Sequence, residues 1–247
     1  GALGWQWAFG ILGFGALGAT ILILLTTRYQ PPLQQHESRR FLNVRAVLGN
    51  RPALAYILSY TLHTTELMTI IAWAVTFLTF AASLQPAGSI SIDVTIFGAL
   101  VSFIAMPASI YGNELARRFG RRRYIFIVML LSMATASVIG FASAISYTVA
   151  AVLVLIYAAL IWADSSSLTA GAVGSALPGQ RGATMAVHSM IGFIGSMAGP
   201  LIFGVVLDIG GGELNQIAWG LSFTVIGLIV VTGPLFVYFM ARDRRPK

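Results

Sequence analysis

Cysteine is absent from this 247-residue chain, and charged residues make up only 9% of it. Without a thiol, these residues can form no disulfide, no zinc–thiolate site and no cysteine nucleophile. About a quarter of the residues of a soluble domain are charged, so the charge here is too sparse to solvate a soluble surface. Hydrophobic residues reach 57% and the mean hydropathy is +0.83. The composition therefore predicts a polytopic membrane protein.

Seven apolar stretches are long enough to cross the membrane as helices, which takes about 20 residues for ~30 Å of hydrocarbon. The fold class that they predict is all-α, with seven transmembrane helices. The predicted spans are residues 3–27, 53–82, 91–112, 124–143, 147–175, 184–208 and 216–241.

All fifteen basic residues fall into alternate connections or after the last span, and the segments near 83–90, 144–146 and 209–215 contain none. Basic residues accumulate in cytoplasmic loops. We therefore expect a multi-pass protein of the cytoplasmic (inner) membrane, with its C-terminus in the cytoplasm and Gly1 on the outer side. Topology also explains the net charge of +7, so no nucleic-acid partner is expected. An outer start without a methionine is best explained if an odd number of spans precedes Gly1, which predicts a fragment.

The densest basic stretch follows the third span, where five arginines lie within positions 117–123 around Gly120. Glycine adopts positive φ at little cost. Residues 111–123 therefore predict a tight cytoplasmic hairpin between two membrane helices.

Ionisable residues at mid-membrane depth are the candidate functional groups, because they are costly there and normally face a cavity or a partner. His63 and Glu66 lie one helical turn apart on the second span, with Glu66 about 20 Å from its cytoplasmic end. Glu66 could bind and release a proton, and His63 could relay protons or donate to a substrate. The alternative is a structural pair that is hydrogen-bonded between helices.

The fifth span contributes Asp164, which could be a second coupling site, a partner for a substrate cation or a packing carboxylate satisfied by the adjacent serines. Trp73 and Tyr157 could contact a substrate, although aromatic residues in spans more often pack against other helices. The sequence contains no G-x-S-x-G, H-E-x-x-H or phosphate-binding loop. We therefore predict no enzyme, no metal site and no cofactor, with a proton gradient as the energy source.

The hairpin Asn113-Glu-Leu-Ala-Arg-Arg-Phe-Gly-Arg-Arg-Arg123 resembles the loop signature G-x-L-A-D-R-x-G-R-R of the major facilitator superfamily. The starts of the first and sixth spans, Gly4-Trp-Gln-Trp-Ala-Phe9 and Pro178-Gly-Gln-Arg-Gly182, are similar to regions of that family's sixth and tenth-to-eleventh helices. The signature differs at Asn113 and Arg117, where glycine and aspartate are usual. Glu114 could supply the missing anion.

The resemblance implies that the chain corresponds to helices six to twelve of a twelve-helix transporter. Residues 1–27 would be the last helix of the N-terminal half, 28–52 the central cytoplasmic linker and 53–247 the C-terminal six-helix transport domain. The partner would be the missing N-terminal half, and the second and fifth spans would line the central cavity. The hairpin would act as a conformational latch in addition to its role in topology; the latch residues would be Glu114, Arg117, Arg118, Gly120, Arg121 and Arg122.

The function that follows is a secondary active permease, which moves a small organic solute by alternating access with proton coupling. Neither the direction of transport nor the solute can be read from the sequence. A seven-span receptor-like or other non-transport membrane module is the alternative.

Overall fold

The computed structural model of the chain describes residues 5–28, 44–86 and 94–241, and the chain divides into two compact units, Gly1–Ser38 and Arg39–Lys247. The first unit contains one apolar helix, α1 (Trp5–Thr26). Within the described residues, seven helical segments are long and apolar enough to cross a membrane, and no strand is present. The predicted all-α fold class is therefore confirmed.

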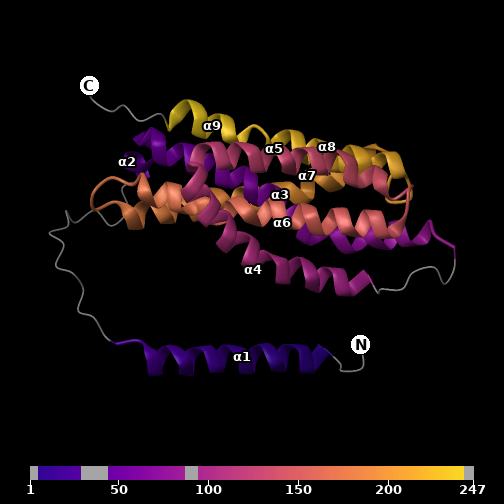
Figure 1. The fold of residues 1–247 in the computed structure, drawn as a ribbon, viewed down its shortest axis with the longest axis horizontal. Helices are drawn as coiled ribbons and strands as arrows, with labels where there is room; N and C mark the ends of the chain where they lie inside the picture. Colours follow the sequence, from indigo (N-terminus) through magenta and orange to yellow (C-terminus); the bar gives the residue numbers. More distant parts are fainter. Residues whose placement is uncertain (1–4, 29–43, 87–93, 242–247) are drawn as a thin grey trace. The chain divides into compact units, whose positions relative to one another are not determined.

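The second unit begins with a short helix and continues as a six-membered bundle of long helices (Figure 1). The short helix, α2 (Val44–Gly49), lies in the predicted linker, of which residues 29–43 are outside the described part. The bundle consists of α3 (Arg51–Ser83), α4 (Val94–Phe119), α5 (Arg121–Ala142), α6 (Tyr147–Gly174), α7 (Arg181–Ile209) and the pair α8 (Gln216–Val230) and α9 (Gly233–Met240).

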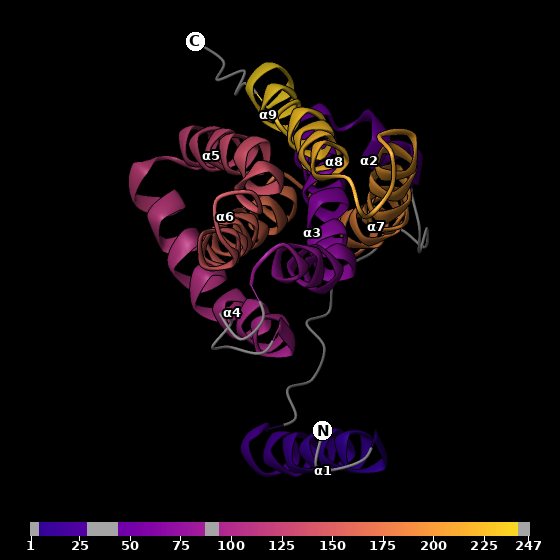
Figure 2. The same ribbon diagram turned by 90° about the vertical axis from the view of Figure 1, so that its right-hand side faces the viewer.

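Helix α3 occupies the middle of the bundle, between α6 and α7 and beneath α8 (Figure 2). Its 33 residues correspond to about 50 Å. Pro52 lies in its first turn, where a missing N–H costs nothing. Most threonines of α3 donate to carbonyls one turn earlier, as Thr61 does to Ile57 and Thr69 to Thr65. The helix thereby satisfies its own hydroxyl groups and can be buried on several sides.

Glycines allow α7 to approach α3 until the backbones almost touch. A Cβ added at Gly195 would lie 2.0 Å from the Thr61 carbonyl oxygen, and one at Gly199 would lie 2.0 Å from that of Thr65. Small residues at helix interfaces in membranes permit this kind of packing. The glycines of α7 therefore serve close packing against α3.

The predicted turn at Gly120 is confirmed, because this residue has φ of +89° and separates α4 from α5. The predicted helix ends at 112 and 124 were wrong. Residues 111–119 continue α4, and α5 begins directly at Arg121. Leucine, alanine and arginine all favour helix, so the helices extend beyond the apolar stretches from which their ends were predicted.

The predicted last span, 216–241, is also interrupted. Helix α8 ends at Val230, and α9 begins at Gly233 after a turn. Pro234, in the first turn of α9, has no N–H to donate, and its ring would clash with the carbonyl oxygen four residues earlier in a continuous helix. This break could have been predicted from the proline.

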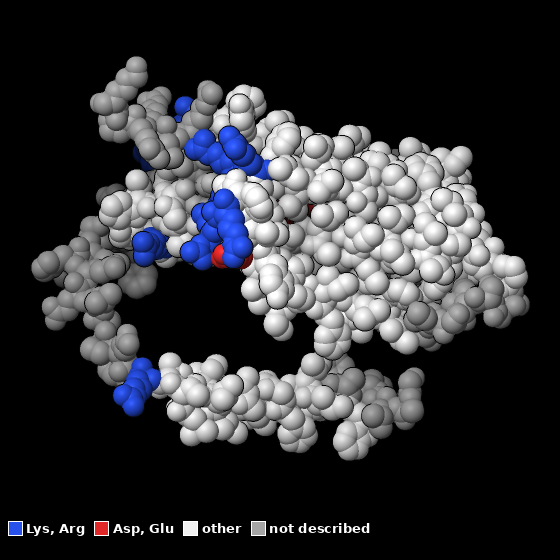
Figure 3. Space-filling model, in the orientation of Figure 1, with Lys and Arg blue, Asp and Glu red and all other residues white. Residues whose placement is uncertain are grey.

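The helix ends that adjoin the arginines lie together at one end of the bundle. The Asn50 side chain, before α3, donates to the Ser175 carbonyl after α6 at 2.7 Å. At the opposite end, the Gln216 amide donates to the Phe141 carbonyl at 3.0 Å. The basic side chains of the described second unit that are visible in Figure 3 accordingly gather at one end, and red carboxylate atoms lie beside them.

Candidate functional site

Glu66 lies near the midpoint of α3 and is only 1% exposed. The hydroxyl group of Ser132, on α5, donates to Glu66 Oε1 at 2.7 Å. The Tyr157 hydroxyl, on α6, interacts electrostatically with the same carboxyl group. The Tyr157 hydroxyl group, however, does not meet the geometric criteria of a hydrogen bond with any described residue. Three helices therefore meet at this one carboxyl group.

His63 contacts the other buried carboxylate, Asp164 on α6, with 2.8 Å between Nδ1 and Oδ1. The distance fits an ion pair, whereas the direction of the ring N–H does not fit a hydrogen bond. The contact is an ion pair when the imidazole of His63 is protonated. Both side chains are at most 3% exposed.

The two contacts form one group of side chains, which we call the buried polar cluster: Glu66, Ser132, Tyr157, His63 and Asp164. Glu66 interacts electrostatically with both members of the His63–Asp164 pair. His63 and Glu66 share α3, as predicted, but they face different neighbours. The cluster lies inside the six-helix unit, because none of its members is more than 3% exposed.

Aromatic and imidazole rings extend this cluster along α3. Tyr60 lies between two histidines, with its ring centroid 5.5 Å from that of His63 and 3.9 Å from that of His188. The Nε2 atom of His188, on α7, is 3.4 Å from the Thr169 hydroxyl oxygen. The sequence prediction missed Tyr60, although its position three residues before His63 puts both on one face of a helix.

Trp73 lies away from the cluster and contacts α7. Its indole N–H donates to the Pro200 carbonyl oxygen at 3.1 Å, and its ring stacks on Phe203 at 5.3 Å. Phe203 in turn packs against Trp219 and Phe223 of α8. The structure therefore gives Trp73 protein partners, and a contact with substrate stays a prediction.

The predicted latch residues lie at the arginine end of the bundle. The Glu114 carboxylate, on the last turns of α4, is 3.3 Å from Arg117 and 2.9 Å from Arg118. Glu114 thus supplies an anion to the arginines within one turn. These side chains are exposed, and exposed ion pairs contribute little to the stability of a fold. Pairs this weak can be exchanged for others at little cost.

The buried polar cluster brings together groups that can each carry a proton. Two carboxyl groups and one imidazole lie in mutual electrostatic contact. Arginines of the described bundle lie only at the ends of its helices: Arg51, Arg117, Arg118, Arg121, Arg122, Arg123 and Arg181. Among the described residues, the imidazole of His63 is therefore the only group at the cluster that can become cationic.

The comparison with protein families agrees with this architecture. The family model of the Major Facilitator Superfamily matches residues 1–171 and again residues 67–247, so that the two matches together cover the whole chain. No curated protein matches the chain at a significant level. The chain thus belongs to the Major Facilitator Superfamily of membrane transporters.

Proposed function

We propose that this chain belongs to a secondary active transporter, which moves a small organic solute by alternating access and uses a proton gradient as its energy source. The buried polar cluster is the coupling site. Glu66 and Asp164 bind and release the proton, and His63 and Tyr157 orient them. The single observation that carries the proposal is the burial of two carboxyl groups in an apolar bundle whose arginines, among the described residues, lie at the helix ends.

The physical argument starts from the cost of charge in a membrane. A carboxylate in the middle of a span is expensive and needs a cationic partner or a proton. Asp164 has His63 at 2.8 Å, whereas Glu66 has the Ser132 hydroxyl at 2.7 Å and an electrostatic contact with the Tyr157 hydroxyl. An ionised carboxylate can accept about four hydrogen bonds. Glu66 therefore has too few donors around it to stabilise a permanent negative charge. A site of this kind suits a group that gains and loses a proton.

Burial favours a proton over the solute as the occupant of this cluster. Glu66 and Asp164 are 1% and 2% exposed, so an organic molecule could reach them only if packed side chains moved apart. The solute would instead bind between this six-helix unit and the preceding half that the sequence predicts. The lack of a fixed cation in the interior of the described spans favours a neutral or cationic solute.

The arginine end supplies the second part of the proposal. Glu114 holds Arg117 and Arg118 in one access state and releases them in the other, as exchangeable surface ion pairs permit. The ion pairs of the hairpin at the membrane surface would thereby differ between the two access states.

The test uses the purified transporter in liposomes with an imposed pH gradient and a panel of neutral and cationic organic solutes. Glu66→Gln and Asp164→Asn should each abolish gradient-driven accumulation, because neither amide can carry the proton. Infrared difference spectroscopy across the pH range should show a protonated carboxyl band that Glu66→Gln removes. This second readout requires no knowledge of the solute.

Glu213→Gln is the matched control, because Glu213 is exposed in the connection between α7 and α8. It should leave both accumulation and the carboxyl band unchanged. If Glu66→Gln and Asp164→Asn also left both readouts unchanged, the cluster would be structural and the proposal of proton coupling would fail.

A further inference from the structure

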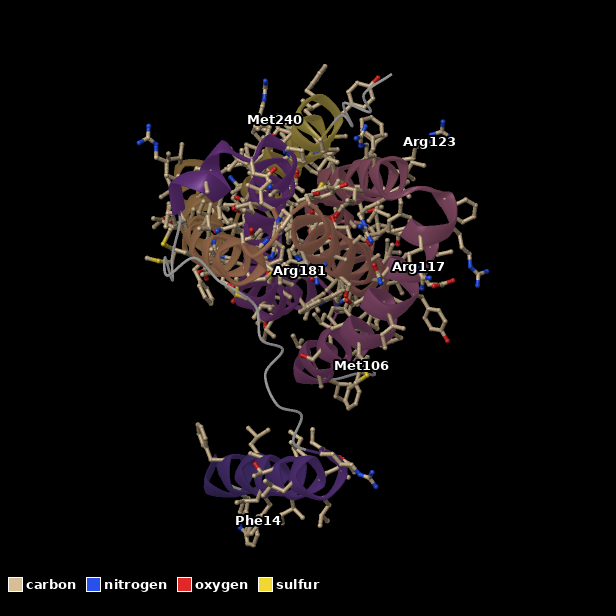
Figure 4. All side chains as sticks on the ribbon, turned by 90° about the vertical axis from the view of Figure 1, so that its left-hand side faces the viewer. Phe14, Met106, Arg117, Arg123, Arg181 and Met240 are labelled. Carbon is tan, nitrogen blue, oxygen red and sulfur yellow. The ribbon has the colours of Figure 1, made fainter. Side chains whose placement is uncertain are left out.

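A groove of about 1230 Å³ lies at the arginine end of the six-helix unit, apart from the buried polar cluster. Its rim is the hairpin between α4 and α5, and its other walls come from α9 and the adjoining ends of α3 and α6. The described residues that line it are Pro52, Tyr56, Arg117, Arg118, Phe119, Gly120, Arg121, Arg122, Arg123, Phe126, Ile127, Ser175, Leu235, Tyr238, Phe239 and Ala241. Figure 4 looks onto this end, with Arg117, Arg123 and Met240 marking α4, α5 and α9.

The rim of the groove has positive charge that the described residues do not neutralise. Arg117 and Arg118 share one carboxylate, that of Glu114. No described residue forms an ion pair with Arg121, Arg122 or Arg123, and the described lining contains no Asp or Glu.

Two details of the backbone and side chains indicate that the rim needs an acceptor. The Nε atom of Arg121 is buried and has no hydrogen-bond partner among the described residues. The N–H groups in the first turn of a helix have no helical acceptors, and no side chain caps α5 at this end. Buried donors are normally satisfied, and an anion at this rim could accept from Arg121 Nε and from the first-turn N–H groups of α5.

The walls below the rim are apolar. Phe126 and Ile127 on α5 and Leu235 on α9 line the groove and are 42–54% exposed. From Arg121 to Ile127, and likewise from Ala241 to Leu235, the helices descend by about 9 Å. The groove therefore changes from cationic to apolar over the depth at which a lipid changes from phosphate to acyl chain.

We propose that this groove binds an anionic phospholipid of the membrane, with the phosphate at Arg121, Arg122 and Arg123 and the acyl chains against Phe126, Ile127 and Leu235. Arginine suits this role because its planar guanidinium group can donate two hydrogen bonds to one phosphate. A free phosphate ion would satisfy the rim but would leave the apolar walls uncovered. The proposal does not depend on proton coupling.

The test is native mass spectrometry of the purified, delipidated chain in detergent, with phosphatidylglycerol, phosphatidylcholine or inorganic phosphate added. Phosphatidylglycerol should bind in preference to the other two. One basic residue at an anionic membrane surface strengthens binding about five-fold. The triple variant Arg121→Gln, Arg122→Gln, Arg123→Gln should therefore lose roughly 100-fold in affinity for phosphatidylglycerol by the same relation.

The matched control is the triple variant Arg45→Gln, Arg51→Gln, Arg181→Gln, which removes equal charge from the second unit outside the groove. It should retain phosphatidylglycerol binding within about two-fold, since it leaves the phosphate contacts intact. Equal losses in the two triple variants would mean general attraction and would overturn the site. Equal competition by inorganic phosphate would identify an ion site and would overturn the lipid assignment. If the first triple variant does not fold, Arg123→Gln alone should lose about five-fold, and no loss there would overturn the proposal.

Discussion

The structure gives Trp73 partners within the protein, and its predicted contact with a substrate stays a prediction. Its N–H donates to the Pro200 carbonyl at 3.1 Å and its ring stacks on Phe203. Glycine at 204 leaves room for the far edge of the indole ring, which a Cβ would approach to 3.1 Å. The residue therefore joins α3 to α7.

Trp73→Phe should lower the thermal stability of the purified protein and leave solute accumulation unchanged. The substitution keeps an aromatic ring but removes the hydrogen bond, which is worth about 1 kcal/mol. Trp73→Ala should cost more, about 3–5 kcal/mol, because it also leaves a cavity. Thermal unfolding in detergent and liposome uptake measure the two effects. If Trp73→Phe lost uptake at unchanged stability, Trp73 would be a substrate contact.

The residues of the candidate site differ in whether the sequence alone can identify them. Glu66, His63 and Asp164 could be selected because ionisable residues are rare in apolar spans. Ser132 could not, since serine is common in such spans and its partner is 66 positions away. Which carboxylate His63 contacts depends on how α3 and α6 are rotated about their axes. Periodicity within one helix does not determine that rotation.

At the scale of the helix, the glycines of α7 illustrate what can be predicted. Several glycines in one apolar span indicate a close neighbour, and the structure shows that this neighbour is α3, with Thr64 donating to the Gly192 carbonyl at 2.7 Å. The sequence does not state which helix approaches, because small residues suit many partners. The helix ends at 119 and 121 were missed for another reason. Polar residues can continue a helix beyond its apolar stretch.

Gly195→Ala should destabilise the bundle, because its Cβ would lie 2.0 Å from the Thr61 carbonyl oxygen, a backbone atom that cannot turn aside. Overpacking of this kind costs about 1–3 kcal/mol. Gly182→Ala is the control on the same helix, since nothing lies within 4 Å of a Cβ at that position. It should be neutral or stabilising by up to about 1 kcal/mol. Equal melting temperatures for the two variants would contradict the close α3–α7 contact.

At the scale of the whole molecule, the order of basic and uncharged connections predicted which helix ends lie together. The groove confirms this for the arginine end, because its lining joins residues from the start of α3, the α4–α5 hairpin and the end of α9. Alternation of long spans dictates this result, since each successive helix must return across the same thickness. Which end faces the cytoplasm is a separate prediction from the positive charges.

The orientation can be tested with a matched pair of exposed leucines, because the chain contains no cysteine that would react in the background. Leu177, between α6 and α7, is 46% exposed, and Leu214, between α7 and α8, is 91% exposed. With the arginine end in the cytoplasm, a membrane-impermeant maleimide should label Leu214→Cys in intact cells and Leu177→Cys only after permeabilisation. The reversed pattern would place the arginine hairpin outside. Its groove would then face the outer leaflet, and the positive-inside assignment would be wrong for this chain.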